Sequence, residues 1–377
     1  MLLFGMTDNI YTPQFELTPG IRATIDAIDR EQWLVDSLLI MPKYEEWIRR
    51  SVWTRRVAAT TAIEQLGIGE EAVDELARKG TRGRPDDLEQ ANLNALRAYE
   101  FVDYVSDQKD IPVDELVIRE LNRVFLHESA DVLTPGVYRK GQNQVYNFTP
   151  PNSGDVPDLM RGFAKWLRED DDAVHPILRA GLAHIHLIAI HPFWDGNGRT
   201  ARAIMTMILQ RSKFGFRKLF SLESEFANPR DEYLTAIERT LGTQFRPDYD
   251  ATRWLEFFTT ALFTAVTRLT TQLKDWRRMM DEMRADFQQV GLSSRETDGL
   301  AYATLKGRIT RGDYIEITGV SPMTASRDLA HMVEVEVFVA YGKTRNRFYV
   351  PEGYEEPGDE NSTSERRAQL LLEPDDR

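Results

Sequence analysis

The stretch His191-Pro192-Phe193-Trp194-Asp195-Gly196-Asn197-Gly198-Arg199-Thr200-Ala201-Arg202 decides how this chain of 377 residues is interpreted. It places a histidine, a carboxylate, an amide, two glycines and two arginines close together. Apolar sequence of helical character lies on both sides, Leu182 to Ile190 before it and Ala203 to Leu209 after it. The stretch therefore predicts a tight polar loop between two helices, with the second helix beginning near Asn197 to Arg199.

The loop and the start of the second helix have the composition of an anion-binding site. The first amide groups of a helix lack intrahelical partners and lie at the positive end of its dipole, which attracts phosphate. Gly196 and Gly198 allow a close approach of the backbone to a ligand, and Asn197 can donate from its side-chain amide. Arg199 and Arg202 are three residues apart, so they share a helix face and can both form forked contacts with phosphate.

A histidine and a carboxylate complete this set. His191 is the side chain that titrates near neutral pH, which makes it the candidate general base. Asp195 offers the hard oxygen that suits Mg²⁺ carrying substrate phosphates. Together these residues predict phosphoryl or nucleotidyl transfer, in which positioning and charge stabilisation dominate catalysis. The alternative is a plain Gly-Asn-Gly turn with two exposed arginines and a buried structural histidine.

The whole stretch is similar to the signature of Fic-domain proteins, His-Pro-Phe-x-(Asp/Glu)-Gly-Asn-Gly-Arg-x-x-Arg, and it matches every fixed position. The resemblance implies a protein adenylyltransferase, which transfers AMP from ATP to a Ser, Thr or Tyr hydroxyl of a target protein or of itself. His191 would then deprotonate the hydroxyl, Asp195 would hold Mg²⁺ on the α- and β-phosphates, and Arg202 would bind the γ-phosphate. The nucleotide-binding residues that the resemblance implies are Gly196, Asn197, Gly198, Arg199, Arg202 and, near the adenine, Tyr233.

The segment from Thr60 to Gln65 has two interpretations. It can be the ordinary end of a helix with a solvated glutamate. It also resembles the inhibitory motif of Fic proteins, (Ser/Thr)-x-x-x-Glu-(Gly/Asn), with Thr60 and Glu64 in place and Gln65 where Gly or Asn is usual. The resemblance implies that Glu64 pairs with Arg202. Such a pair would occupy the guanidinium fork that the γ-phosphate needs, and the enzyme would be autoinhibited.

Residues 135–145 combine β-type side chains with glycine turns, which predicts a small β-hairpin in an otherwise helical chain. A connecting loop is the alternative. Gly136, Tyr138 and Arg139 resemble the Fic flap, a hairpin that docks the incoming target segment by adding a strand.

Residues 295–351 read as a separate unit. A Gly319 turn followed by Ser321 and Pro322 separates two predicted helices, and two predicted strands complete a winged helix-turn-helix. The run Thr318–Leu329 resembles the C-terminal winged helix of many Fic proteins. Because residues 306–347 carry a net charge of only +2, DNA binding through residues 309–347 and a role in protein docking or homodimerisation are both open.

Composition limits the class of protein. The net charge of −13 at pH 7 argues against bulk, non-specific nucleic-acid binding, and the absence of cysteine excludes disulfides and cysteine metal sites.

His184 and His186 are two positions apart on one helix and face different sides, so we expect structural roles for both. The apolar runs are too short for a membrane span and no signal peptide is recognisable, so we predict a cytoplasmic protein with no membrane partner.

The predicted fold class is mainly α: a Fic helical bundle with a small β-hairpin flap, plus a C-terminal winged helix-turn-helix domain. The expected parts are an N-terminal helical region carrying the inhibitory motif (1–108), the Fic catalytic core (109–265), a connecting helix and linker (266–294), the winged helix-turn-helix (295–351) and a disordered acidic tail (352–377).

Two functions are compatible with these parts. The first is an adenylyltransferase with ATP as co-substrate, Mg²⁺ as cofactor and a protein target. The second is a nucleotide-sensing, DNA-binding transcriptional regulator that uses the C-terminal winged helix. The second function depends on four basic residues, Arg327, Lys343, Arg345 and Arg347. We rank the enzyme first because a decayed catalytic site is expected to lose some signature positions, and none is lost here.

Overall fold

The computed structural model describes residues 11–40, 42–81, 83–129, 134–169, 174–289, 291–343 and 347–352. The predicted acidic tail lies outside these residues from 353 onward, as does Arg345. The chain forms two compact units, one made of Met1–Ser37 with Arg49–Thr267 and the other of Leu38–Ile48 with Arg268–Arg377.

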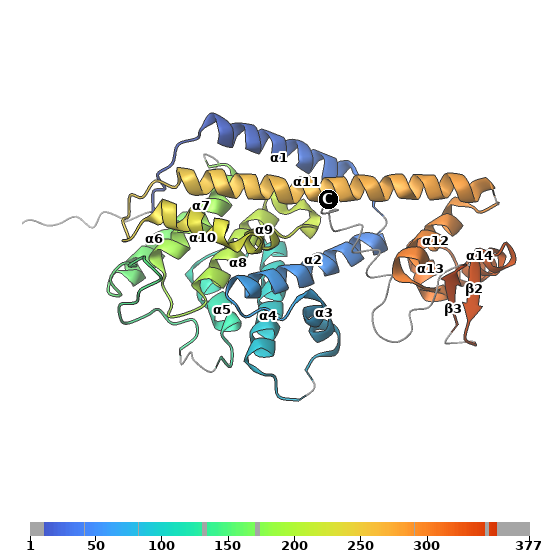
Figure 1. Ribbon diagram of the computed structural model, residues 1–377, viewed down its shortest axis with the longest axis horizontal. Helices are drawn as coiled ribbons and strands as arrows, with labels where there is room; N and C mark the ends of the chain where they lie inside the picture. Colours follow the sequence, from blue (N-terminus) through green and yellow to red (C-terminus); the bar gives the residue numbers. More distant parts are fainter. Residues whose placement is uncertain are drawn as a thin grey trace, which may run out of the picture. The chain divides into compact units, whose positions relative to one another are not determined.

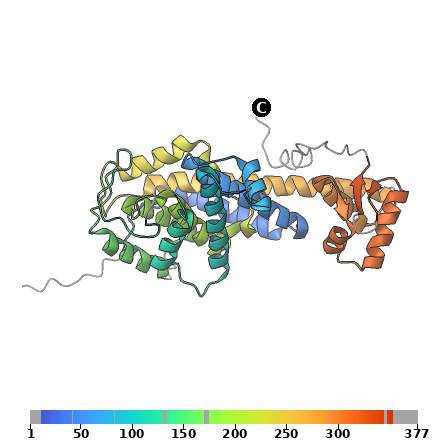
Figure 2. The same cartoon turned by 90° about the horizontal axis from the view of Figure 1, so that it is seen from below.

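The first unit is helical (Figures 1 and 2). Two of its helices, α2 (Pro42–Ile63) and α11 (Thr252–Gln289), also contribute residues to the second unit. The remaining helices are α1 (Pro19–Ser37), α3 (Glu70–Lys79), α4 (Asp87–Asp107), α5 (Glu115–Phe125), α6 (Val156–Arg168), α7 (Pro176–Ile190), α8 (Asn197–Arg211), the 3₁₀ helix η1 (Lys213–Lys218), α9 (Leu222–Ala227) and α10 (Arg230–Leu241).

Helices α7 and α8, which flank the polar loop, form the centre of this unit. Almost every residue of α7 is buried, as expected for a helix that is apolar on all sides. Trp254 of α11 packs against α7, where its ring stacks on His184 at 4.7 Å and its Nε1 donates to the Gly181 carbonyl at 2.7 Å. Helices α4 and α5 pack against α8 (Figure 1). The polar loop is therefore held between two fully packed helices.

The predicted hairpin at residues 135–145 is much reduced. Val145 and Phe148 form one antiparallel bridge around a tight turn, with both N–H···O distances at 2.9 Å. No strand occurs among residues 134–152. Instead, Arg139 fixes the segment by donating from its backbone N–H to the Pro192 carbonyl at 2.9 Å. The segment is thus a loop anchored on the 191–196 region rather than a regular hairpin.

The second unit contains three short helices and a small sheet: α12 (Ser294–Lys306), β1 (Ile309–Thr310), α13 (Arg311–Thr318), α14 (Pro322–Glu334), β2 (Phe338–Tyr341) and β3 (Phe348–Pro351). The sheet is antiparallel with the order β1-β3-β2. A left-handed Gly319 ends α13, and Ser321 caps α14, as the sequence predicts. The strand β1 was not predicted, and β2 begins later than expected because Glu336 adopts a φ of 58° in the preceding turn.

Side-chain hydrogen bonds to Asp328 connect the helices of this second unit. Asp328 of α14 accepts from Arg295 at 2.6 Å and from the Tyr314 hydroxyl at 3.0 Å. Within the same unit, Tyr44 of α2 stacks on Trp276 of α11 at 4.4 Å. No helix in the described part of the chain is both long enough and apolar enough to cross a membrane.

Candidate functional site

The polar loop begins and ends with a residue in the left-handed region. His191 caps the C-terminal end of α7 with φ 50° and ψ 59°, and its N–H still donates to the Leu187 carbonyl at 3.0 Å. Gly196 is the N-cap of α8 with φ 74°, and the first intrahelical bond of α8 runs from Thr200 to Gly196 at 2.9 Å. The amide groups of residues 197–199 therefore precede the hydrogen-bond ladder of α8, as an anion site requires.

His191 lies in a setting that keeps its imidazole neutral. Burial, with a contribution from the Arg139 cation, lowers its pKa to about 4, although Glu64 and Asp195 act in the opposite direction. The left-handed backbone at a non-glycine residue is strained. Arg139 stabilises this backbone conformation by donating from Nε to the His191 carbonyl at 2.9 Å. At neutral pH the ring is able to accept a proton.

Asn197 braces the loop with its side chain. Its Oδ1 accepts from the Phe193 N–H at 3.0 Å, and its Nδ2 donates to the Phe193 carbonyl at 2.9 Å. The residue is 2 % exposed. This differs from the expected contact of the amide with a phosphate, because one N–H of Nδ2 is already used inside the loop. Any anion contact at this position would come mainly from the backbone.

Asn122 of α5 is a site residue that the sequence did not reveal. Its Nδ2 donates to the Asp195 carbonyl at 2.9 Å, and its Oδ1 accepts from the Gly136 N–H at 2.9 Å. A Cβ on Gly196 would lie 2.9 Å from this Nδ2, so Gly196 is required by space as well as by its φ. The only available signal was an amide at a position of α5 that the helical pattern places among buried apolar residues. Asn122 thus ties the polar loop to the 134–152 segment.

Asp195 is the exposed carboxylate of the site, and the buried Arg199 lies beside it. The Asp195 side chain is 55 % exposed, and its Oδ2 accepts from Arg199 Nη2 at 3.1 Å. Arg199 is buried, and its Nε has no hydrogen-bond partner in the described part of the chain. A buried cationic donor without a partner beside a helix N-terminus favours an anionic ligand.

The donors at this site fit Mg²⁺ held chiefly by a substrate. Among the described residues, no group of three or more His, Asp or Glu side chains is arranged to hold a metal ion. An ion at Asp195 would therefore take most of its ligands from phosphate oxygens and water, which is the usual situation for Mg²⁺.

Arg202 uses its whole guanidinium group inside the protein. Nε donates to Thr60 Oγ1 at 2.9 Å, Nη2 donates to the Thr60 carbonyl at 3.1 Å, and Nη1 donates to the Tyr233 hydroxyl at 3.3 Å. Nη2 also donates to Glu64 Oε1 at 2.7 Å. Arg202 is 1 % exposed. The ion pair between Glu64 and Arg202 that the sequence predicts is therefore present.

The Glu64 carboxylate covers the N-terminus of α8. A Cβ on Gly198 would lie 2.5 Å from Glu64 Oε1, so only glycine leaves room for this carboxylate. Burial acts to raise the pKa of Glu64, but Arg202, Arg199 and Arg230 outweigh it and leave the pKa below its usual value. Glu64 therefore carries its negative charge into the place where the helix dipole attracts an anion.

Helix α2 ends directly before Glu64 in a regular C-terminal motif. The Leu66 N–H donates to the Thr61 carbonyl at 2.9 Å, and the Gln65 N–H donates to the Ala62 carbonyl at 2.9 Å. These two bonds are those of a Schellman motif, whose left-handed residue is here Gln65 with φ 62°. The preference for Gly or Asn at this position thus has a physical reason, because both adopt this conformation more easily than Gln.

Tyr233 is fully buried, at 1 % exposure. Its hydroxyl contacts Arg202 Nη1 and His184 Nε2, the latter at 3.0 Å, and its ring stacks on Phe226 at 4.7 Å. No ring surface is left for a nucleotide base, so the expected contact with adenine is replaced by support of Arg202.

The second histidine of α7, His186, is also buried and stacks on Tyr11 at 3.4 Å, so both α7 histidines are structural as predicted.

The three residues expected in the flap have structural contacts. Arg139 is 1 % exposed and donates to the carbonyls of His191, Gly141 and Pro151. Gly136 is buried with φ 74°, and the Tyr138 ring packs against Phe193 at 5.5 Å. The Arg139 guanidinium group thus holds this segment against the loop. The docking of a target by this segment stays a prediction.

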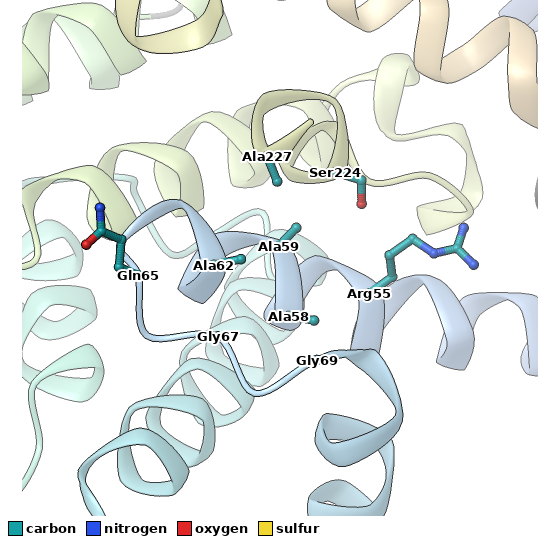
Figure 3. A pocket seen from close by; sticks show the side chains of 9 residues that line it. All are labelled: Arg55, Ala58, Ala59, Ala62, Gln65, Gly67, Gly69, Ser224 and Ala227. Atoms are coloured by element: carbon teal, nitrogen blue, oxygen red, sulfur yellow. The ribbon is translucent and has the colours of Figure 1, made fainter. Parts of the chain in front are cut away.

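A cavity of about 470 Å³ lies between α2, the residues that follow it and α9 (Figure 3). Ala58, Ala59 and Ala62 form its floor, and Ser224 and Ala227 face them from α9. No residue of the 191–202 stretch lines it. It is separate from the site built around His191.

Part of this chain is similar to known proteins. Residues 112–209 match the model of the Fic/DOC family. The chain is 40% identical over 106 residues to the protein adenylyltransferase Fic of Drosophila yakuba, which covers 28% of this chain and 21% of that protein. It is 42% identical over 98 residues to the protein of the same name from Drosophila ananassae, with 26% and 20% covered. The chain thus spans about a fifth of the length of these relatives.

Solved structures share the fold. A Fic family protein from Desulfovibrio desulfuricans G20 superposes with a TM-score of 0.62 at 20% identity, covering 92% of this chain and 100% of that chain. Fic-1 from C. elegans superposes with a TM-score of 0.55 at 21% identity, covering 69% of this chain and 72% of that chain.

Proposed function

Because residues 112–209 form a domain of the Fic/DOC family, we propose that this protein is an adenylyltransferase that moves AMP from ATP to a hydroxyl group of a protein. The observation that carries the proposal is the juxtaposition of a neutral His191 with the N-terminus of α8, where the amides of residues 197–199 have no intrahelical acceptor. Arg199 adds a buried donor that lacks a partner among the described residues. The curated relatives that match this region are named for the same activity.

In the proposed reaction, His191 takes the proton of the target hydroxyl while the hydroxyl oxygen attacks the α-phosphorus of ATP. The bond between the α-phosphorus and the bridging oxygen breaks, and pyrophosphate leaves with that electron pair. The amides of residues 197–199 and the Arg199 guanidinium hold the phosphates. Mg²⁺ held by Asp195 and the phosphates would neutralise charge on the leaving pyrophosphate.

Glu64 gives the proposed enzyme an inhibited resting state. Its carboxylate occupies one side of the Arg202 fork and stands over Gly198. A γ-phosphate cannot use the same fork at the same time. ATP would therefore bind in an unproductive position until Glu64 moves away.

We propose the following parts for the chain. Residues 1–108 form a helical region that carries the inhibitory motif, and residues 109–265 form the catalytic core. Residues 266–294 connect this core to a winged helix-turn-helix at 295–351.

A second candidate function, DNA binding by residues 309–347, is favoured by the exposed Arg311 and Arg327 on α13 and α14. Reversing both charges should abolish binding to duplex DNA in an anisotropy titration and leave AMP transfer intact. Dimerisation through this unit is the competing role.

The reaction is tested with labelled ATP. Glu64→Gly and Glu64→Gly/His191→Ala are each incubated with Mg²⁺, cell lysate and ATP labelled at either the α- or the γ-phosphate. The proposal predicts protein-bound label only from α-labelled ATP and only with His191 present. Label from γ-labelled ATP would indicate phosphoryl transfer instead, and full activity without His191 would remove this residue from the mechanism.

A further inference from the structure

The C-terminal end of α2 depends on a side chain from α10. The Schellman motif satisfies the carbonyls of Thr61 and Ala62 and leaves out the carbonyl of Ile63. Arg230 donates to this Ile63 carbonyl from Nε at 2.6 Å. Ile63 is the last residue of α2, and the next residue is Glu64. The contact is therefore one residue away from the carboxylate that pairs with Arg202.

The charge of Arg230 is unfavourable at the start of its own helix but favourable at the end of α2. Arg230 is the first residue of α10, where a cation faces the positive end of its own helix dipole. At the C-terminal end of α2 the same cation meets the negative end of the dipole and an orphan carbonyl, which are both favourable. Asp231 and Glu232 supply the acidic residues that the first turn of α10 prefers.

Arg230 also acts on Glu64 through its charge. It is one of three arginines, with Arg202 and Arg199, whose attraction lowers the pKa of the Glu64 carboxyl. Arg202 and Arg199 belong to α8, whereas Arg230 belongs to α10. Arg230 thus holds α2 by its carbonyl and attracts the glutamate that follows.

We propose that Arg230 is a positioning residue that caps α2 and thereby keeps Glu64 in its inhibitory pair with Arg202. The inference rests on the proposed function, because it assigns Arg230 to the inhibited state of the same site. Loss of the cap should let the last turn of α2 fray and release Glu64, so the enzyme should become more active when Arg230 is removed.

The test compares initial labelling rates from α-labelled ATP. Arg230→Ala should raise the rate of the wild-type protein roughly fivefold, which corresponds to the loss of one ordinary hydrogen bond. In the Glu64→Gly background the same substitution should give no gain in rate, because the residue that Arg230 positions is gone. Arg230→Lys, which restores a cation, should lie between wild type and Arg230→Ala. Arg239→Ala is the matched control, since Arg239 is an exposed arginine in the last turn of the same helix.

Three results would overturn the inference. One is an unchanged rate in Arg230→Ala while Glu64→Gly is active. Another is a lower rate in both backgrounds, which would assign Arg230 to nucleotide binding. The last is an equal gain in both backgrounds.

A second readout does not depend on activity. Hydrogen exchange of the Gln65 and Leu66 amides, which donate within the α2 end, should be faster in Arg230→Ala than in Arg239→Ala. If no variant labels protein, the proposed function fails, and the exchange rates still decide whether Arg230 caps α2. Equal exchange in the two variants would contradict the capping role.

Discussion

Glu64 Oε1 lies 2.7 Å from Nη2 of Arg202, although 137 residues of chain separate the two. The arginine is buried and the glutamate side chain is 34 % exposed. Thr60 contacts the same guanidinium group through its hydroxyl and its carbonyl. The last turn of α2 supplies the groups that orient Arg202, and the residue that follows this turn supplies the inhibitory carboxylate. The two effects can therefore be separated by mutation.

Thr60→Val tests the orienting contact. The substitution keeps the shape of the side chain but leaves Arg202 Nε buried without its acceptor. We expect the free energy of unfolding to fall by about 1–3 kcal/mol. AMP transfer in the Glu64→Gly background should also fall, since Arg202 is no longer held in place. Denaturant unfolding and labelling rates check both effects.

Thr60→Ser is the control for that experiment because it retains the hydroxyl. It should keep AMP transfer close to that of the Glu64→Gly parent. If Thr60→Val behaves like Thr60→Ser in both measurements, the contact does not matter for Arg202.

Gln65→Gly tests the strain at the end of α2. A non-glycine residue in the left-handed region is disfavoured by about 1–2 kcal/mol, whereas glycine adds up to about 1 kcal/mol of unfolded-state entropy. The net expectation is a stabilisation of about 0.5–1 kcal/mol and a lower labelling rate than wild type, because the end of α2 is held more firmly. Gln65→Ala, which keeps the strain, should show no gain. A higher labelling rate in Gln65→Gly would contradict this account of the motif.

The pH dependence of AMP transfer reports on His191. Its pKa is lowered to about 4, so the neutral, proton-accepting form is populated above that value and lost below it. In Glu64→Gly, one carboxylate that acts to raise this pKa is absent, so the acid limb should not move upward. We expect kcat/KM to be nearly constant from pH 8 to pH 6. A decline centred near the ordinary histidine pKa of about 6.5 would show that the ring is not held neutral by burial.

Asn122→Ala tests the brace between α5 and the loop. It leaves the Asp195 carbonyl and the Gly136 N–H without their partner. We expect a loss of about 1–3 kcal/mol in the free energy of unfolding and a lower rate of AMP transfer in the Glu64→Gly background. Asn152→Ala, at an exposed asparagine, should change neither quantity. A rate equal to that of the parent would mean that the loop keeps its shape without Asn122.

The sequence predicted the local features of the site because they are encoded at short range. The helix-loop-helix around His191, the start of its second helix and the two helices on either side of Gly319 all follow from spacing and turn residues. The pair between Glu64 and Arg202 was predicted only through the family resemblance, since no periodicity links residues so far apart.

The sequence does not show which partner a side chain finds on a distant element. Tyr233 and Arg139 are both buried and bonded within the protein, and only packing decides between such contacts and contacts with a ligand. The role of Asn122 could not be predicted, because an amide within an apolar helix pattern does not show what it bonds to. The hairpin was predicted from β-type residues, but Arg139 and Asn122 hold the segment without a ladder of strand hydrogen bonds.

The most direct test of the central claim is the labelling rate of wild type, Glu64→Gln and Glu64→Gly with α-labelled ATP and Mg²⁺. Glutamine fills the same space without the charge, so it separates the ion pair from simple occlusion of the site. The account predicts little label with wild type, more with Glu64→Gln and most with Glu64→Gly. Equal rates in all three proteins, with ATP binding verified by calorimetry, would contradict the claim that Glu64 controls Arg202.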